Sequence, residues 1–113
     1  WWRRRILSMG DPVLCPSITF AKSNCPEVIF KNHFLASEDW EALEMLSKLD
    51  GDFLYDKNIL SYHRIHAEST TTLAFSLNKR YVEDYEMYQK FWPKWIAKIL
   101  VTFYSKSQKS NEV

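Results

Sequence analysis

Residues 89–107, QKFWPKWIAKILVTFYSKS, carry the strongest pattern in this chain. Lysines recur there every four residues, so on an α-helix they would lie along one face. Large apolar side chains occupy an arc of roughly 140° on the other side of the same helix. The lysines are Lys90, Lys94 and Lys98, and the apolar residues are Trp92, Trp95, Ile96, Ile99, Leu100 and Phe103. Such a helix either covers a hydrophobic core or docks on something outside the molecule.

The energetics of burial favour a place inside the fold. Each fully buried Leu, Ile or Phe contributes about 1.5–3 kcal/mol, so leaving six large apolar residues in water would forfeit on the order of 10 kcal/mol. That loss is comparable to the whole stability of a domain. We therefore expect residues 89–107 to cover a sheet, with their lysines in solvent.

The helical period begins upstream of this stretch. Four aromatic residues share an arc that continues into the last segment, and Pro93 falls on the lysine side. A proline there bends a helix without interrupting its buried stripe. We predict a kinked helix, or two abutting helices, over residues 80–106. The four aromatic residues are Tyr81, Tyr85, Tyr88 and Trp92.

An earlier helix is predicted between Ser37 and Gly51. Ser37 is a good N-cap, acidic residues follow it, and Asp50-Gly51 supplies a stop signal. One apolar stripe runs along this helix. It consists of Trp40, Leu43, Leu46 and Leu49.

Six short segments have the composition of strands. The first, RRRILSM, ends at a Gly-Asp-Pro turn signal. Two others share an echo, C-P-x-(Ile/Val)-x-Phe, whose apolar residues are two apart. The last three are separated by polar turns. The predicted strands are residues 3–9, 17–21, 27–32, 53–55, 59–66 and 72–77.

These elements follow the order β-β-β-α-β-β-β-α. We predict an α+β fold, in which an antiparallel sheet of five or six strands has both helices packed on one face. A length of 113 residues suits one domain. We expect a single domain over 1–113, frayed at 1–2 and 107–113.

Charge and composition limit the classes of partner. The net charge is +1, whereas nucleic-acid-binding domains are markedly basic, so a nucleic-acid partner is not expected. No window of about 18 apolar residues exists, so no transmembrane helix is expected. The chain starts with Trp1 instead of Met and has two glycines, as a processed, truncated or engineered chain would. A cytoplasmic, reduced protein is the default.

The two cysteines, Cys15 and Cys25, bear on this default. If strands 17–21 and 27–32 pair through a turn at 22–24, the cysteines lie roughly 20 Å apart at 3.3 Å per residue. A disulfide needs Cα atoms within about 7 Å, so the hairpin and the disulfide exclude each other. We expect free thiols. A bridge would instead indicate a secreted protein.

No motif for catalysis or for a cofactor is present. His63 and His66 would point to opposite faces of a strand, and His33 is the only other imidazole, so we expect no metal site. Both cysteines precede proline and open no helix that would activate a thiol. The acidic run at 50–56 resembles a calcium loop, but Ser61 stands where its last Glu is required.

We therefore expect a non-catalytic protein-interaction or binding module, with another protein or a second copy of the chain as partner. The surplus of aromatic residues, 16% of the chain, would leave an exposed apolar patch of the kind that partners cover. The candidate surface is Tyr81, Tyr85, Tyr88, Trp92 and Trp95, and the candidate basic face is Lys90, Lys94 and Lys98.

Three alternatives stay open. A basic amphipathic helix at 89–107, if free, is typical of a membrane-surface or calmodulin-type binder. The three tyrosines of helix 80–106 could line a small-ligand cup, because a row of buried hydroxyls needs polar partners. An engineered fold without a biological task is the third alternative.

Overall fold

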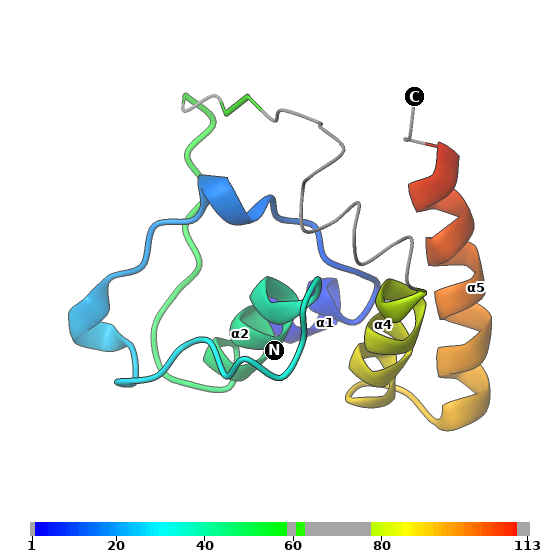
Figure 1. Ribbon diagram of the computed structural model, residues 1–113. Coiled ribbons are helices and arrows are strands. Elements are labelled where there is room, and N and C mark those ends of the chain that lie inside the picture. The colour runs from blue at the N-terminus through cyan, green and yellow to red at the C-terminus, as the bar shows by residue number, and fades with distance from the viewer. Residues whose placement is uncertain (1, 59–60, 63–77, 111–113) are drawn as a thin grey trace.

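All regular secondary structure in the part of the chain that the structure describes is helical, and long irregular segments connect the helices. The computed structural model describes residues 2–58, 61–62 and 78–110, and these residues contain no strand (Figure 1). The predicted α+β fold, with an antiparallel sheet of five or six strands, is therefore wrong. The elements are α1 (Trp2–Leu7), η1 (Cys15–Ser17), η2 (Lys22–Asn24), α2 (Glu38–Leu46), α4 (Lys79–Gln89) and α5 (Lys94–Ser110), where η denotes a 3₁₀ turn.

The helix predicted after Ser37 is confirmed as α2. Its first turn carries three acidic residues, which the positive end of the helix dipole favours. Trp40, Leu43 and Leu46 are buried, as their spacing predicted. The Ser37 hydroxyl makes no cap bond and instead donates to the Asp84 carboxylate of α4 at 2.8 Å. The start of α2 is thus tied to α4.

Residues 3–9, predicted as the first strand, lie mostly in helix α1. Arg and Leu are good helix formers, whereas a strand needs a neighbour for its backbone groups. The arginines hold this short helix in place. Arg3 donates to two backbone oxygens just beyond α2, and Arg4 donates to the Glu44 carboxylate within α2.

The segments 17–21 and 27–32 are not strands. The backbone is extended at Ile18 (φ −91°, ψ 133°) and at Cys25 (φ −108°, ψ 151°), but it pairs with no other segment among the described residues. The turns η1 and η2 interrupt it instead, and the two cysteines carry free thiols. The sequence correctly predicted extended backbone at these positions, but the predicted pairing into a hairpin is wrong.

The remaining predicted strands have no support in the structure. Residues 53–55 are irregular. The predicted strands at 59–66 and 72–77 lie outside the described residues, apart from Ser61 and Tyr62, which are also irregular.

Helices α4 and α5 fold back on each other and lie side by side at one edge of the molecule (Figure 1). Of the two predicted alternatives for residues 80–106, two separate helices is the one observed. Pro93 directly precedes α5, and its carbonyl oxygen accepts a hydrogen bond from the amide of Ala97 at 3.0 Å. Proline suits this position because its missing N–H needs no partner at a helix start. The proline therefore marks a turn between helices, not a bend within one.

The core draws on all four described helices. Trp40 lies at its centre, edge-to-face on Tyr88 with ring centroids 5.1 Å apart, and its Nε1 donates to the backbone oxygen of Leu7 at 2.9 Å. Ala97 and Val101 close the core from the α5 side. The buried cluster consists of Leu7, Phe34, Trp40, Leu43, Met87, Tyr88, Ala97 and Val101.

The segment after α1 lies against α4 and α5. Trp92 Nε1 and Tyr88 Oη donate to the carbonyl oxygens of residues 8 and 9 at 2.9 and 3.1 Å, and Tyr104 Oη accepts from the amide of residue 11 at 3.4 Å. Gly10 has φ +145°, and a Cβ there would lie 3.0 Å from the Tyr104 ring. A glycine is therefore needed for this close approach.

Candidate docking surface

Helix α5 presents a row of large apolar side chains to solvent. Trp95 and Phe103 are each 68% exposed, and Ile99 is 50% exposed. A spacing of four residues places them along one line, about 12 Å long at 1.5 Å per residue. With Lys98 and Thr102 they line a shallow groove of about 390 Å³. These five residues are called the outer face of α5 below.

This orientation corrects the sequence interpretation. Of the six large residues predicted to face inward over a sheet, Trp92 and Leu100 do pack against the core, whereas Trp95, Ile99 and Phe103 are exposed. A second stripe of α5 faces α4. Ala97 and Val101 on that stripe are fully buried, and Tyr104 is half-buried. Small side chains let two helices approach to about 8–10 Å between axes, which a tryptophan at the contact would prevent. The spacing of Ala97, Val101 and Tyr104 was the signal that the sequence analysis missed.

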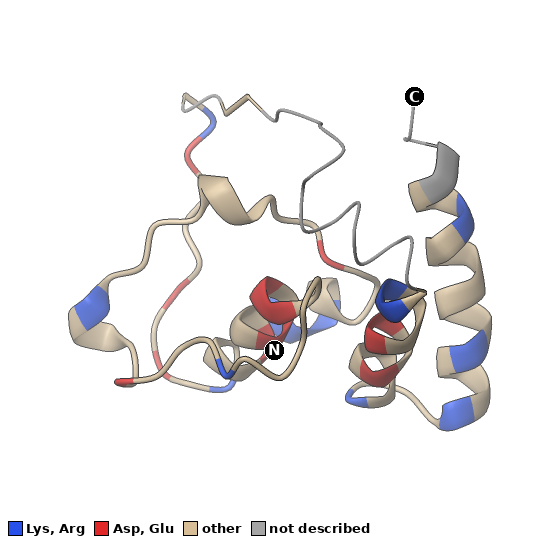
Figure 2. Cartoon of the chain, in the orientation of Figure 1, with Lys and Arg blue, Asp and Glu red and all other residues tan. Residues whose placement is uncertain are grey.

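The charge on α5 has one sign. Its 17 residues include four lysines and no Asp or Glu. Figure 2 shows basic residues along α5, whereas acidic residues appear on α2 and α4. Lys94, Lys98 and Lys106 are all exposed. Lys90 lies in the turn before α5, so it is separated from the other lysines of the predicted basic face.

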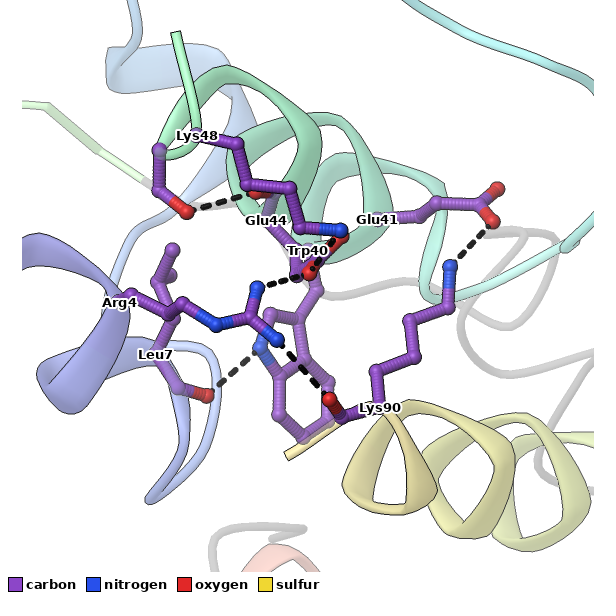
Figure 3. Close-up of polar contacts among 8 residues, drawn as sticks. Arg4, Leu7, Trp40, Glu41, Glu44, Lys48 and Lys90 are labelled. Carbon is purple, nitrogen blue, oxygen red and sulfur yellow. Dashed lines mark hydrogen bonds and ion pairs between the residues drawn. The ribbon is translucent and has the colours of Figure 1, made fainter. Parts of the chain in front are cut away.

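Two buried carboxylates of α2 hold α1 and the turn before α5 in place (Figure 3). Glu44 accepts from Arg4 and pairs with Lys48 Nζ at 2.7 Å. Burial would raise the pKa of Glu44, but these two contacts outweigh burial and lower it. Glu41 pairs with Lys90 Nζ at 2.7 Å, and the pKa of Glu41 is likewise lowered against the effect of burial. Lys90 therefore has a structural partner.

The three tyrosines predicted to line one ligand cup lie in three different environments. Tyr88 is buried in the core, and Tyr85 packs at the margin of the core. Tyr81 is exposed and lines a separate cavity of about 330 Å³, together with Arg80 and Asp84. Trp92, half-buried, is held by its bond to the backbone of residue 8. Of the predicted surface residues, Trp95 and Lys98 belong to the outer face of α5.

Two neighbouring acidic residues of α4 fix the start of α2. Glu83 accepts from the backbone amides of residues 35, 36 and 37 at 2.8, 2.8 and 3.1 Å. Asp84 is 1% exposed, and its pKa is raised from 3.8 to about 6 because burial outweighs the favourable contacts with Arg80 and Ser37. Arg80 Nε and Asp84 Oδ2 lie 3.7 Å apart, and neither has a hydrogen-bond partner among the described residues.

Other kinds of site are not found in the described part of the chain. Within residues 2–58, 61–62 and 78–110, no cluster of three or more His, Cys, Asp or Glu side chains could hold a metal ion. No helix of this part combines the length and apolar character needed to cross a bilayer. No protein-family model, curated protein or solved structure matches the chain. The outer face of α5 is therefore a candidate docking surface on the basis of its exposure, geometry and charge alone.

Proposed function

We propose that this protein is a non-catalytic binding module that docks through the outer face of α5 onto an apolar, negatively charged partner surface. One observation carries the proposal. Three large apolar side chains stand exposed in a row on a helix that carries four lysines and no acidic residue. Single exposed apolar residues are normal on protein surfaces, whereas a contiguous row is typical of an interaction site.

Basic and acidic residues are unevenly distributed along the chain, although its net charge is small. α1 contributes three arginines, α5 contributes four lysines, and neither helix contains an acidic residue. The other residues of the chain comprise 8 basic and 14 acidic ones, which leaves a net charge of −6 for them. A local positive field can attract a negatively charged partner even when the net charge is only +1.

The buried apolar area that the outer face could contribute is too small to give tight binding by itself. Aromatic side chains bury 150–250 Å² each, so covering the exposed two thirds of Trp95 and Phe103 removes roughly 250 Å² from water. At 25 cal/mol per Å², this area contributes about 6 kcal/mol. Association costs about 4 kcal/mol or more, so the net apolar affinity is weak. Attraction to the lysines is therefore part of the proposed recognition.

The packing of α5 and the positions of the tyrosines argue against two of the alternatives, a calmodulin-type binder and a small-ligand cup. A calmodulin-type partner that wraps a helix would need the inner stripe of α5, which is packed against α4. The three tyrosines do not face one cavity, so they do not form a common ligand cup.

We also place the protein in the cytoplasm in this proposal, because Cys15 and Cys25 are free thiols.

An anionic apolar dye tests whether the outer face binds such a partner. Anilinonaphthalene sulfonate combines aromatic rings with one negative charge and fluoresces on apolar surfaces. We expect the fluorescence gain of the wild-type protein to fall by more than half in the double variant Trp95→Ala/Phe103→Ala. The matched control is Leu54→Ala/Tyr55→Ala, which removes two side chains that are more than nine-tenths exposed elsewhere. Equal fluorescence in the two double variants would overturn the proposal, provided that circular dichroism shows both folded.

A further inference from the structure

We infer that the partner of the outer face is an anionic lipid bilayer, an inference that rests on the proposed docking function. The apolar row would enter the boundary between headgroups and acyl chains, and the lysines would contact anionic headgroups. Interfacial helices combine Trp, Phe or Leu on one face with Lys or Arg beside it, and their apolar face enters the bilayer by about 5–10 Å. α5 has this composition on its free side.

The shape of the surface supports a flat partner. α5 lies at the edge of the molecule, and its inner stripe packs on α4 (Figure 1). Trp95, Ile99 and Phe103 therefore stand on the outward side of an outermost helix, and the groove between their side chains is shallow. A protein partner would need a groove to receive such a ridge, as in other helix-in-groove complexes. A bilayer surface accepts a ridge without a matching cavity. Tryptophan is also enriched at the level of lipid headgroups.

Two lysines of α5, Lys98 and Lys106, lie where they can reach the same plane. Lys98 lines the groove with Trp95 and Phe103, so its charge lies beside the apolar row. At 100° per residue, Lys106 projects about 20° from Ile99 on the helical wheel and Lys98 about 100° from it, whereas Lys94 lies about 140° away, close to the inner stripe. Long lysine stems can cover apolar surface while the ammonium group stays at the polar boundary. The cytoplasmic leaflet is negatively charged, which suits this arrangement.

A second copy of the chain fits the surface poorly. Two α5 helices docked through their outer faces would bring Lys98 and Lys106 of both copies together without one acidic residue from either helix. Repulsion between like charges opposes that contact, and an isologous dimer cannot avoid it. An acidic protein surface would satisfy the charges but would also need a groove. The bilayer meets both requirements.

Vesicle co-sedimentation of the whole protein tests this inference. We expect binding to vesicles of phosphatidylcholine with one quarter phosphatidylglycerol, and little binding to pure phosphatidylcholine. Trp95→Ala/Phe103→Ala should weaken binding by about tenfold or more, since it removes most of the inserted surface. Lys98→Glu/Lys106→Glu should weaken it at least about 25-fold, since each lysine near an anionic surface contributes roughly fivefold.

Matched controls separate the site from general charge and hydrophobicity. Leu54→Ala/Tyr55→Ala removes exposed apolar groups elsewhere, and Lys22→Glu/Lys57→Glu makes the same charge change away from α5. Both controls should bind within about twofold of wild type. Equal binding to neutral and anionic vesicles, or equal losses in control and α5 variants, would overturn the inference. Absence of vesicle binding while the dye still binds the outer face would also overturn it, and would leave an acidic protein as the partner of an intact docking module.

Discussion

Trp40 anchors the core, and its replacement by Phe should lower the free energy of unfolding by about 3 kcal/mol. The side chain is fully buried and packs edge-to-face on Tyr88 and nearly parallel to Phe91. Its Nε1 donates to the Leu7 carbonyl oxygen at 2.9 Å. Phe leaves that buried oxygen with only a long bond from the Gly10 amide, at 3.4 Å, and losing the indole donor costs about 1–3 kcal/mol. The smaller ring also leaves a cavity, which adds about 1 kcal/mol.

The same substitution at Trp95 is the matched control. Because Trp95 is 68% exposed, Trp95→Phe should change the free energy of unfolding by less than about 0.5 kcal/mol. Urea unfolding followed by far-ultraviolet circular dichroism measures both variants, since tryptophan fluorescence would itself change. With a slope of about 1.5 kcal/mol per M, Trp40→Phe should lower the midpoint by roughly 2 M.

Two results would refute this reasoning. A loss below about 1 kcal/mol for Trp40→Phe would show that the residue does not hold the core as described. Equal losses in the two variants would show that Trp95 is buried, and would favour the inward-facing helix that the sequence indicates.

Two further predictions concern the carboxylates of α4. Glu83→Gln removes the charge shared by three backbone amides and should cost about 2–3 kcal/mol in urea unfolding, whereas Glu86→Gln, exposed on the same helix, should cost under about 0.5 kcal/mol. Similar losses in both would contradict the bonding described. The pKa of Asp84 is raised from 3.8 to about 6 in the native state, so the native state holds the proton more tightly and the free energy of unfolding should fall as pH rises through this range. Asp84→Asn should remove up to roughly 3 kcal/mol of that fall, and an unchanged pH profile between these values would disprove the assignment.

The sequence was sufficient to predict those helices that local residue patterns specify. α2 could be predicted because Ser37, the acidic first turn and the stripe of Trp40, Leu43 and Leu46 all indicate the same helix. The helical period of α4 and α5 was also readable. Leu49, predicted on the same stripe as Trp40, lies beyond the end of α2 and is exposed.

The orientation of α5 and its packing against α4 could not be predicted from local patterns. α5 has two apolar stripes, and hydrophobicity alone favours the one with Trp95 and Phe103. Packing distance favours the small residues Ala97 and Val101, a choice that depends on α4 lying alongside. Pro93 could equally bend one helix or separate two. For this reason the sequence indicated only Trp95 and Lys98 of the candidate docking surface, because Ile99 and Phe103 join it only when the smaller stripe faces inward.

Extended backbone without a partner explains the errors in the first third of the chain. The residues around Ile18 and Cys25 adopt extended angles, as their β-branched and proline-flanked sequences favour. A ladder requires a second strand at the right register, and nothing in a short segment specifies that neighbour. Phe20 and Phe30, which end the two echoes, meet edge-to-face with centroids 5.8 Å apart. The echo therefore corresponds to a ring contact.

The aromatic bonds to residues 8–11 have a consequence for synthesis of the protein. Tyr88, Trp92 and Tyr104 leave the ribosome some eighty or more residues after the segment that they hold. α1 can pack on α2 once residues 38–51 are made, but residues 8–11 must wait for these aromatic partners until most of the chain is translated. Contacts this distant along the chain slow folding, and until they form the core residues Leu7 and Trp40 stay uncovered on the side that α4 and α5 later close.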